Sequence, residues 1–220
     1  MKTICVIPAY NESSSLSKVI NDLVGLVDKI VVVDDASTDS TLEILKSLPV
    51  EVLSHVINRG QGAALRTGTI YALQQGADII VHFDADGQFR AEDIGRLIEP
   101  IKQGQAEVVF GSRFLDNTTI MPNFKRTVIM PLARLVNSLF FNIRLTDPQS
   151  GFRALSRRAA EKITWQQDRM AHCSEILVLA HRSNLPLTEV PITVLYANFG
   201  QRLGGGFKIL RDLFFAKLNN

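Results

Sequence analysis

The sequence has little of what marks exported, thiolate-liganded or membrane-spanning proteins. Its 220 residues include two cysteines, Cys5 and Cys173, which lie far apart and form no Cys-x-x-Cys pair. We expect buried thiols in a reducing cytoplasm, not disulfides or a thiolate metal site. No run reaches the roughly 20 apolar residues of a spanning helix, because polar residues and Pro131 interrupt the stretch 127–141. The N-terminus lacks the pattern of a signal peptide, so we expect a cytoplasmic protein that is not exported by that route.

Two common phosphate-binding loops are also missing. The segment 60–65 lacks the third glycine of the dinucleotide-binding fingerprint, and no Gly-x-x-x-x-Gly-Lys-Ser/Thr motif occurs. Without those loops, a nucleotide diphosphate would have to be neutralised chiefly by a metal ion.

The charges are unevenly distributed along a chain whose composition is that of one folded domain. Hydrophobic residues make up 46% of it and charged residues 21%, which suits a single sizeable core. Residues 1–112 carry 9 Lys/Arg and 15 Asp/Glu, a sum of −6, whereas residues 113–162 carry 9 and 3, a sum of +6. This asymmetry favours a cation site in the first part and phosphate or membrane contacts in the second. Random drift of surface charge is the alternative, and no nucleic-acid partner is expected.

Apolar runs alternate with stretches of helical spacing through the first half of the chain. We expect strands at 3–8, 29–33, 50–55, 78–83 and 107–112, and helices at 16–27, 41–48, 62–75 and 91–103. This alternation predicts an α/β fold with a mostly parallel, doubly wound sheet. We assign residues 1–198 to one domain, and residues 199–220 to a glycine-rich loop with a basic amphipathic helix.

Two carboxylates follow the apolar run 79–83. Residues two apart in an extended chain project to the same side, so Asp84 and Asp86 can aim at one point beyond the strand. Two such anions without a basic neighbour repel each other, and a hard divalent cation relieves the repulsion. The pair therefore predicts a metal site, and a solvated Asp-Gly turn is the alternative.

Polar residues also follow the other expected strands. In a doubly wound sheet the ligand lies beyond the carboxyl ends of the strands. The segments at those ends are 8–12, 34–37, 58–60, 84–86 and 111–113. Because they carry acidic, amide and basic groups, we expect them to form one binding edge.

Six motifs stand in order along the chain: PAYNE (8–12), VDDASTD (33–39), the stretch 58–68, DADGQ (84–88), GSR (111–113) and DPQSGFR (147–153). Together they resemble the family 2 glycosyltransferases of the GT-A fold. Within that family they are most similar to the dolichyl- or polyprenyl-phosphate mannose or glucose synthase branch.

The resemblance implies a nucleotide-diphospho-sugar donor, a divalent metal such as Mg²⁺ or Mn²⁺, and inverting transfer. Asp84, Asp86 and Gln88 would hold the metal, and Asp35 the base or the ribose. Tyr10 could equally be a core residue, and Asp39 is interpreted as a helix cap. The full set of expected donor-binding residues is Pro8, Ala9, Tyr10, Glu12, Asp35, Asn58, Gly62, Asp84, Ala85, Asp86 and Gln88.

The acceptor decides which further groups are needed. A hydroxyl requires a general base, whereas a phosphate monoester is already an anion near pH 7 and needs only to be held. Arginine forks suit phosphate, and Arg113, Arg126 and Arg153 match the family's acceptor region. With Asp86 and Glu175 they form the expected catalytic group, and the resemblance implies transfer of a hexose from a UDP- or GDP-sugar to a polyprenyl or dolichyl phosphate.

Glu175 has two interpretations. It occupies a position where hydroxyl-directed relatives keep a catalytic base, which would suit a glycan or glycolipid acceptor. The surrounding text resembles the polyprenyl-phosphate branch, where this acid would orient an arginine. Two other classes also fit parts of the pattern: a haloacid-dehalogenase-like phosphatase and a non-catalytic nucleotide-sugar binder.

The last residues depart from the pattern of the resembled branch. The loop there contains three consecutive glycines, 204–206, with Arg202 and Lys208 nearby, and the helix expected at 206–220 is basic and amphipathic. Such a helix would bind the cytoplasmic face of a membrane or a small membrane-protein partner, or would pack on the domain's own sheet.

Overall fold

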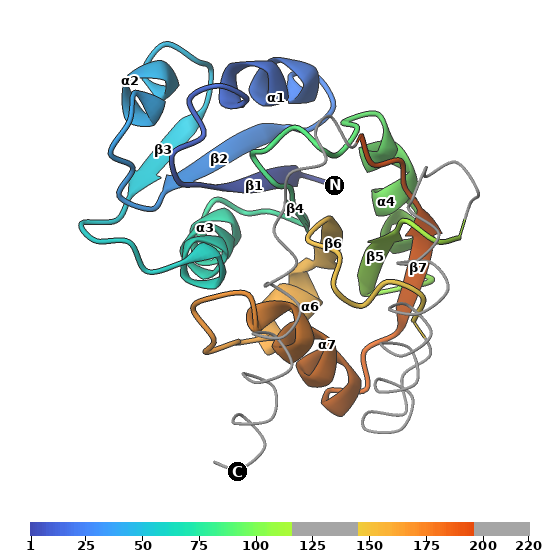
Figure 1. Ribbon diagram of the computed structural model, residues 1–220. Helices are drawn as coiled ribbons and strands as arrows, with labels where there is room; N and C mark the ends of the chain where they lie inside the picture. Colours follow the sequence, from blue (N-terminus) through green and yellow to red (C-terminus); the bar gives the residue numbers. More distant parts are fainter. Residues whose placement is uncertain (116–144, 196–220) are drawn as a thin grey trace, which may run out of the picture.

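The structure is a computed structural model of the chain, in which residues 1–115 and 145–195 are described (Figure 1). Its strands are β1 (Thr3–Ala9), β2 (Lys29–Asp34), β3 (Glu51–Ser54), β4 (Ile79–His82), β5 (Val108–Ser112), β6 (Arg153–Ser156) and β7 (Leu187–Pro191). Its helices are α1 (Leu16–Leu23), α2 (Thr41–Leu45), α3 (Gln61–Gln74), α4 (Asp93–Lys102), α6 (Arg157–Lys162) and α7 (His172–Arg182).

The strands form one mixed sheet in the order β3-β2-β1-β4-β6-β5-β7. β6 runs antiparallel to its neighbours β4 and β5, and the remaining pairs are parallel. The α/β fold with a mostly parallel, doubly wound sheet is therefore confirmed.

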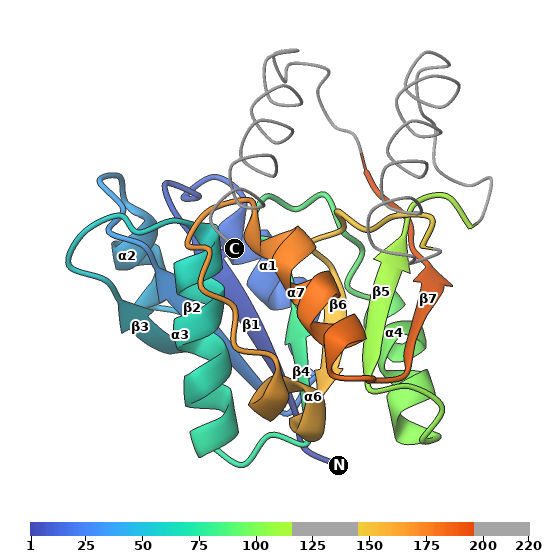
Figure 2. The ribbon, with the colours of Figure 1, turned by 90° about the horizontal axis from the view of Figure 1, so that it is seen from below.

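Helices cover both faces of the sheet (Figures 1 and 2). The apolar core beneath α1 and α4 contains Cys5 and Ile7 of β1, whereas the core beneath α3, α6 and α7 contains Ile4 and Val6 of the same strand. Alternate residues of one strand thus enter opposite cores. This double burial explains why β1 is apolar from Ile4 to Ala9 instead of alternating with polar residues.

The sheet differs from the sequence-based expectation at β6 and β7, which were not among the five expected strands. β6 separates β4 from β5, so that Arg153 pairs with His82 on one side and Phe110 on the other. An antiparallel strand begins where its parallel neighbours end. Residues 147–152, which precede β6, therefore lie at the carboxyl edge of the parallel strands.

The remaining expectations hold to within a few residues or fall outside the described ranges. The helix expected at 41–48 ends earlier, because Ser47 and Leu48 donate to carbonyls three residues back and form tighter turns. Cys5 and Cys173 are buried free thiols, as expected. In the two described ranges, no helix has the length and apolar character needed to cross a membrane. The helix expected at 206–220 lies outside them.

Candidate active site

The loops that follow β1, β2, β3 and β4 meet the segment before β6 at the carboxyl edge of the sheet (Figure 2). Loop 10–13 is fixed to the loop after β2. Asn11 accepts a hydrogen bond from the amide of Thr38 at 2.8 Å, and the Asn11 amide donates to the hydroxyl of Ser37 at 3.0 Å. These bonds hold the first two loops of the edge together.

Asp84 lies at the centre of this edge and is half-buried. Gln61, at the start of α3, donates its side-chain amide to Asp84 Oδ1 at 2.7 Å. Gly151 lies against the other oxygen, since a Cβ on it would be 2.6 Å from Asp84 Oδ2. Burial, and next the charge of Asp86, raise the pKa of Asp84 to about 7. This carboxylate is thus oriented by the protein, yet no cation of the described chain fully compensates it.

Asp86 is exposed and bends back on its own loop, where its Oδ1 accepts the Gln88 amide at 3.0 Å. Gly87 between them has φ +72°, a left-handed turn that favours glycine. Glu12 lies close enough to Asp86 for the negative charge of Asp86 to affect the pKa of Glu12. Burial raises the pKa of Glu12. A hydrogen bond from Ser15 lowers it, and the negative charges of Asp86 and Asp39 raise it further.

This set of groups fits a hard divalent cation only in part. Carboxylate and amide oxygens are the ligands that Mg²⁺ and Mn²⁺ prefer, and Mg²⁺ sites commonly add substrate phosphates and water to one or two carboxylates. Within residues 1–115 and 145–195, no group of three or more His, Cys, Asp or Glu side chains could hold a metal. Asp84 and Asp86 suit a site completed by a diphosphate, and Gln88 stays a predicted ligand.

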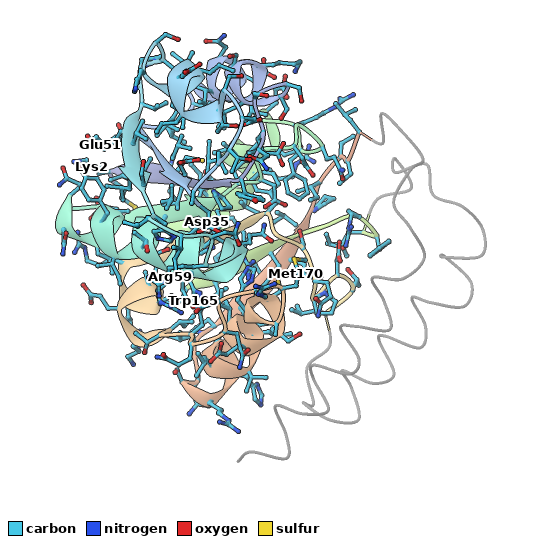
Figure 3. All side chains as sticks on the ribbon, turned by 60° about the vertical axis from the view of Figure 1, so that its left-hand side comes forward. Lys2, Asp35, Glu51, Arg59, Trp165 and Met170 are labelled. Carbon is cyan, nitrogen blue, oxygen red and sulfur yellow. The ribbon has the colours of Figure 1, made fainter. Side chains whose placement is uncertain are left out.

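Asp35 is almost fully buried, and its carboxylate binds the loop after β3. Figure 3 labels Asp35 and, on that loop, Arg59. It accepts the amides of Arg59 at 2.9 Å and Gly60 at 2.6 Å, and it contacts His55 Nδ1 at 2.7 Å. Asn58 donates its side-chain amide to the Asp35 carbonyl at 3.3 Å. The predicted contacts of Asp35 and Asn58 with the donor stay predictions. Their observed contacts hold the loop 55–60 in place.

Gly62 belongs to the packing of α3 against the segment 165–168. A Cβ on Gly62 would lie 2.3 Å from the Gln167 carbonyl oxygen, and the Ala63 amide donates to the Asp168 carbonyl at 3.1 Å. Trp165 donates its indole N–H to the Gly62 carbonyl at 2.9 Å. Because Gly62 has no side chain, the backbone of the segment 165–168 can pack closely against α3. These contacts do not test the predicted role of Gly62 in donor binding.

The other expected donor residues differ in exposure. Pro8, Ala9 and Ala85 are buried, and Asp35 donates its amide to the Ala9 carbonyl at 2.8 Å. Tyr10 is 45% exposed, so the alternative of a core residue is wrong. Asp39 accepts the Thr41 amide at 2.9 Å at the start of α2, as the helix-cap interpretation requires.

Arg113 forms a two-pronged ion pair with Asp147. Its Nε lies 2.6 Å from Oδ2 and its Nη2 lies 2.7 Å from Oδ1. Glu189, on β7, accepts the amides of Thr146 and Asp147 at 2.7 Å each and so fixes this loop. Arg113 is about a quarter exposed, with its side chain at 27%, and lies at the carboxyl edge after β5.

Arg153 lies inside the protein, with no exposed surface. Its Nη2 contacts His172 Nε2 at 3.2 Å and donates to Cys173 Sγ at 3.3 Å, and its Nε donates to the Gly151 carbonyl at 3.4 Å. Its Nη1 is buried and has no hydrogen-bond partner in the described ranges. The predicted hold of this arginine on an acceptor phosphate finds no support in these surroundings.

Glu175, on α7, binds backbone amides. Its two oxygens accept the Gln166 amide at 3.0 Å each, and Oε2 accepts the Gln167 amide at 2.8 Å. The structure records no arginine contact of this carboxylate within the described residues. The interpretation that it orients an arginine is thus not supported, whereas a role as base stays a prediction. Arg126, the remaining arginine expected to contact the acceptor, lies outside the described residues, as do Arg202 and Lys208.

Several residues of this edge escaped sequence reasoning. Gln61 and Gly151 touch Asp84 and lie within recognised motifs, so their position was a usable signal. His55, which stands outside the six motifs, contacts Asp35. Glu189 stands outside every motif, and nothing in the sequence points to it.

Comparison with known proteins agrees with this arrangement. Residues 4–164 match the family described as Glycosyl transferase family 2. A UDP-N-acetylglucosamine–dolichyl-phosphate N-acetylglucosaminyltransferase of Methanococcus voltae is 36% identical over 97% of this chain and 95% of its own. The polyprenol monophosphomannose synthase of Mycolicibacterium smegmatis is 28% identical over 97% of this chain and 84% of its own.

Among solved structures, a complex of glucosyl-3-phosphoglycerate synthase from Mycobacterium tuberculosis with Mn²⁺, uridine diphosphate and phosphoglyceric acid has a TM-score of 0.77. It is 19% identical, with 99% of this chain and 78% of that one covered, and at this identity the likeness shows the fold alone. The family match excludes the phosphatase alternative. The chain belongs to the family 2 glycosyltransferases and is a transferase of the GT-A fold.

Proposed function

We propose that the chain moves a hexose from a nucleotide-diphosphate sugar to a polyprenyl or dolichyl phosphate, with Mg²⁺ or Mn²⁺ bound at Asp84 and Asp86. The names of the two relatives support a lipid-phosphate acceptor. The enzyme would act at the cytoplasmic face of a membrane, where such an acceptor is reached.

The contacts of Glu175 are the observation that carries the choice of acceptor. Transfer to a hydroxyl needs a general base, and Glu175 is the residue expected to supply it. Its carboxylate instead accepts hydrogen bonds from two backbone amides, so both of its oxygens are already engaged within the protein. A phosphate acceptor needs no base, so this arrangement favours the phosphate.

Donor binding is assigned to the acidic part of the edge. The half-buried Asp84 and the exposed Asp86 would hold the cation, which stabilises the negative charge that develops on the leaving diphosphate. Gln61 and Gly151 keep Asp84 in one orientation. Arg113, fixed by Asp147, would hold the acceptor phosphate.

The test has two stages. Thermal-shift measurements with UDP-, GDP- and dTDP-sugars, each with and without Mg²⁺ or Mn²⁺, identify the donor. Transfer of labelled sugar into the organic phase is then compared for a prenyl phosphate and for the corresponding prenyl alcohol. We expect transfer to the phosphate alone, and transfer to the alcohol would contradict the proposed acceptor.

The metal assignment is tested by Asp86→Ala. Asp86 is exposed and outside the strand, so the fold should survive while metal-dependent donor binding is lost. Asp22→Ala is the matched control, because Asp22 is also an exposed aspartate and pairs only with Lys18 in the described structure. Normal metal dependence in the Asp86 variant would show that Asp86 is not a ligand.

A further inference from the structure

The loop after β3 exposes two adjacent apolar side chains. Val56 is 96% exposed and Ile57 is 68% exposed. The backbone on both sides of them is held firmly, because His55 donates its amide to the Asp34 carbonyl at 2.9 Å and the Arg59 and Gly60 amides bind the Asp35 carboxylate. The two side chains therefore project from a fixed loop into solvent, where they contribute little to the stability of the fold and mark an interaction site.

A second exposed segment adjoins this loop. A Cβ on Gly60 would lie 2.5 Å from the Asp168 carbonyl oxygen and 3.0 Å from Arg169 Cγ. Arg169 is exposed, and Met170 next to it is 51% exposed. We call Val56, Ile57, Arg59, Arg169 and Met170 together the loop patch.

The charge of the loop patch is positive. Arg59 and Arg169 are both exposed, and the structure records no ion pair for either of them with a described residue. Asp168, the acid within these segments, is paired with Arg66 at 2.5 Å. Apolar side chains beside unpaired cations are complementary to the boundary between acyl chains and anionic headgroups.

We propose that the loop patch is a membrane-contact surface that inserts Val56 and Ile57 into an anionic bilayer. It lies at the carboxyl edge of the sheet, so contact there brings the candidate active site to the lipid surface. The choice of a bilayer rests on the proposed lipid-phosphate acceptor. Vesicle binding is measured without donor or turnover, and transfer to a water-soluble short-chain prenyl phosphate is measured without a bilayer, so either idea can fail alone.

Insertion is tested by a probe at position 56. Cys5 and Cys173 are buried, so an environment-sensitive fluorophore attaches selectively to Val56→Cys. Leu26→Cys is the control: Leu26 is 44% exposed and precedes β2, at the opposite edge of the sheet. With vesicles containing about 30% anionic lipid, we expect a blue shift at position 56 and none at position 26. No shift at position 56, or equal shifts at both positions, would overturn the proposal.

Binding strength is tested with the full chain carrying Val56→Ser and Ile57→Ser together. Losing two inserted side chains should weaken vesicle binding, measured by sedimentation, about a hundredfold or more, whereas the control Val24→Ser with Leu26→Ser should sediment like the unmodified protein. Thermal shift with the donor nucleotide should be unchanged in both. Unchanged sedimentation of the Val56/Ile57 variant would refute insertion, and lost nucleotide binding would assign the two residues to the donor site instead.

Discussion

Replacing Glu175 separates a role as general base from a structural role in holding the segment 165–168, because loss of each role has a different effect on rate and stability. The carboxylate accepts the amides of Gln166 and Gln167 and thereby fixes the segment 165–168. That segment packs on the start of α3, whose first residue, Gln61, contacts Asp84. Loss of the carboxylate should therefore reduce stability first and activity only indirectly.

The size of the effect follows from the hydrogen bonds. A bond to a charged group contributes about 1.5–3 kcal/mol, less where water can replace it. Glu175 is half-buried, so Glu175→Ala, which strips both amides of their acceptor, should cost about 2 kcal/mol. Glu175→Gln keeps one acceptor oxygen and should cost about 1 kcal/mol. For a domain of this size, 1 kcal/mol lowers Tm by about 2–4 °C.

The assay pairs thermal unfolding with transfer rates measured well below Tm. We expect Glu175→Gln to lose a few degrees of Tm and to keep kcat within about tenfold, since a general base contributes about 10²–10⁴. Glu43→Gln is the matched control: Glu43 is exposed on α2 and should change neither quantity. A Glu175→Gln variant with normal Tm and a thousandfold lower kcat would contradict the structural role and indicate that Glu175 is a general base.

The remaining predictions concern a close contact and a buried charge. Gly151→Ala should weaken metal-dependent donor binding about tenfold or more, because its Cβ would lie 2.6 Å from Asp84 Oδ2; isothermal titration measures this. Gly95→Ala, with nothing within 4 Å, is the control and should leave binding unchanged. Burial lowers the pKa of His172 from 6.5 to about 4. The unfolded chain then binds a proton that the folded chain does not, so the free energy of unfolding should fall by up to about 3 kcal/mol between pH 6.5 and 4. Urea unfolding at several pH values checks this, His172→Asn should flatten the slope, and a slope of opposite sign would contradict the argument. His82, also buried with a lowered pKa, adds in the same direction.

The fold could be predicted as far as local pattern determines it. β1 and β4 are apolar runs bounded by polar residues, and in the helices between them apolar residues recur at helical spacing. β6 could not be found in this way: it has four residues, begins with Arg153, and runs antiparallel only because of the strands on either side. Strand direction and neighbour order depend on contacts between distant segments, which no local periodicity contains.

The candidate site divides in the same way. Asp84 and Asp86 were predictable because they are two residues apart and follow an apolar run. Arg153 carries the charge that phosphate binding needs, but its burial depends on His172 and Cys173, far along the chain. Residue type alone cannot distinguish an arginine that faces a ligand from one that faces the core.

The hydrogen bonds of the carboxylates supply the distinction that residue type lacks. Asp35, Asp147, Glu175 and Glu189 each take part in three recorded side-chain hydrogen bonds with other protein groups, mostly backbone amides. A carboxylate with its oxygens so engaged stabilises loops, and little of its acceptor capacity is left for a ligand. Asp84 and Asp86 accept one each from the described residues. The negative charge available to a cation therefore lies on these two residues and on Glu12, which accepts one such bond from Ser15, while the acids around them hold neighbouring loops of the same edge.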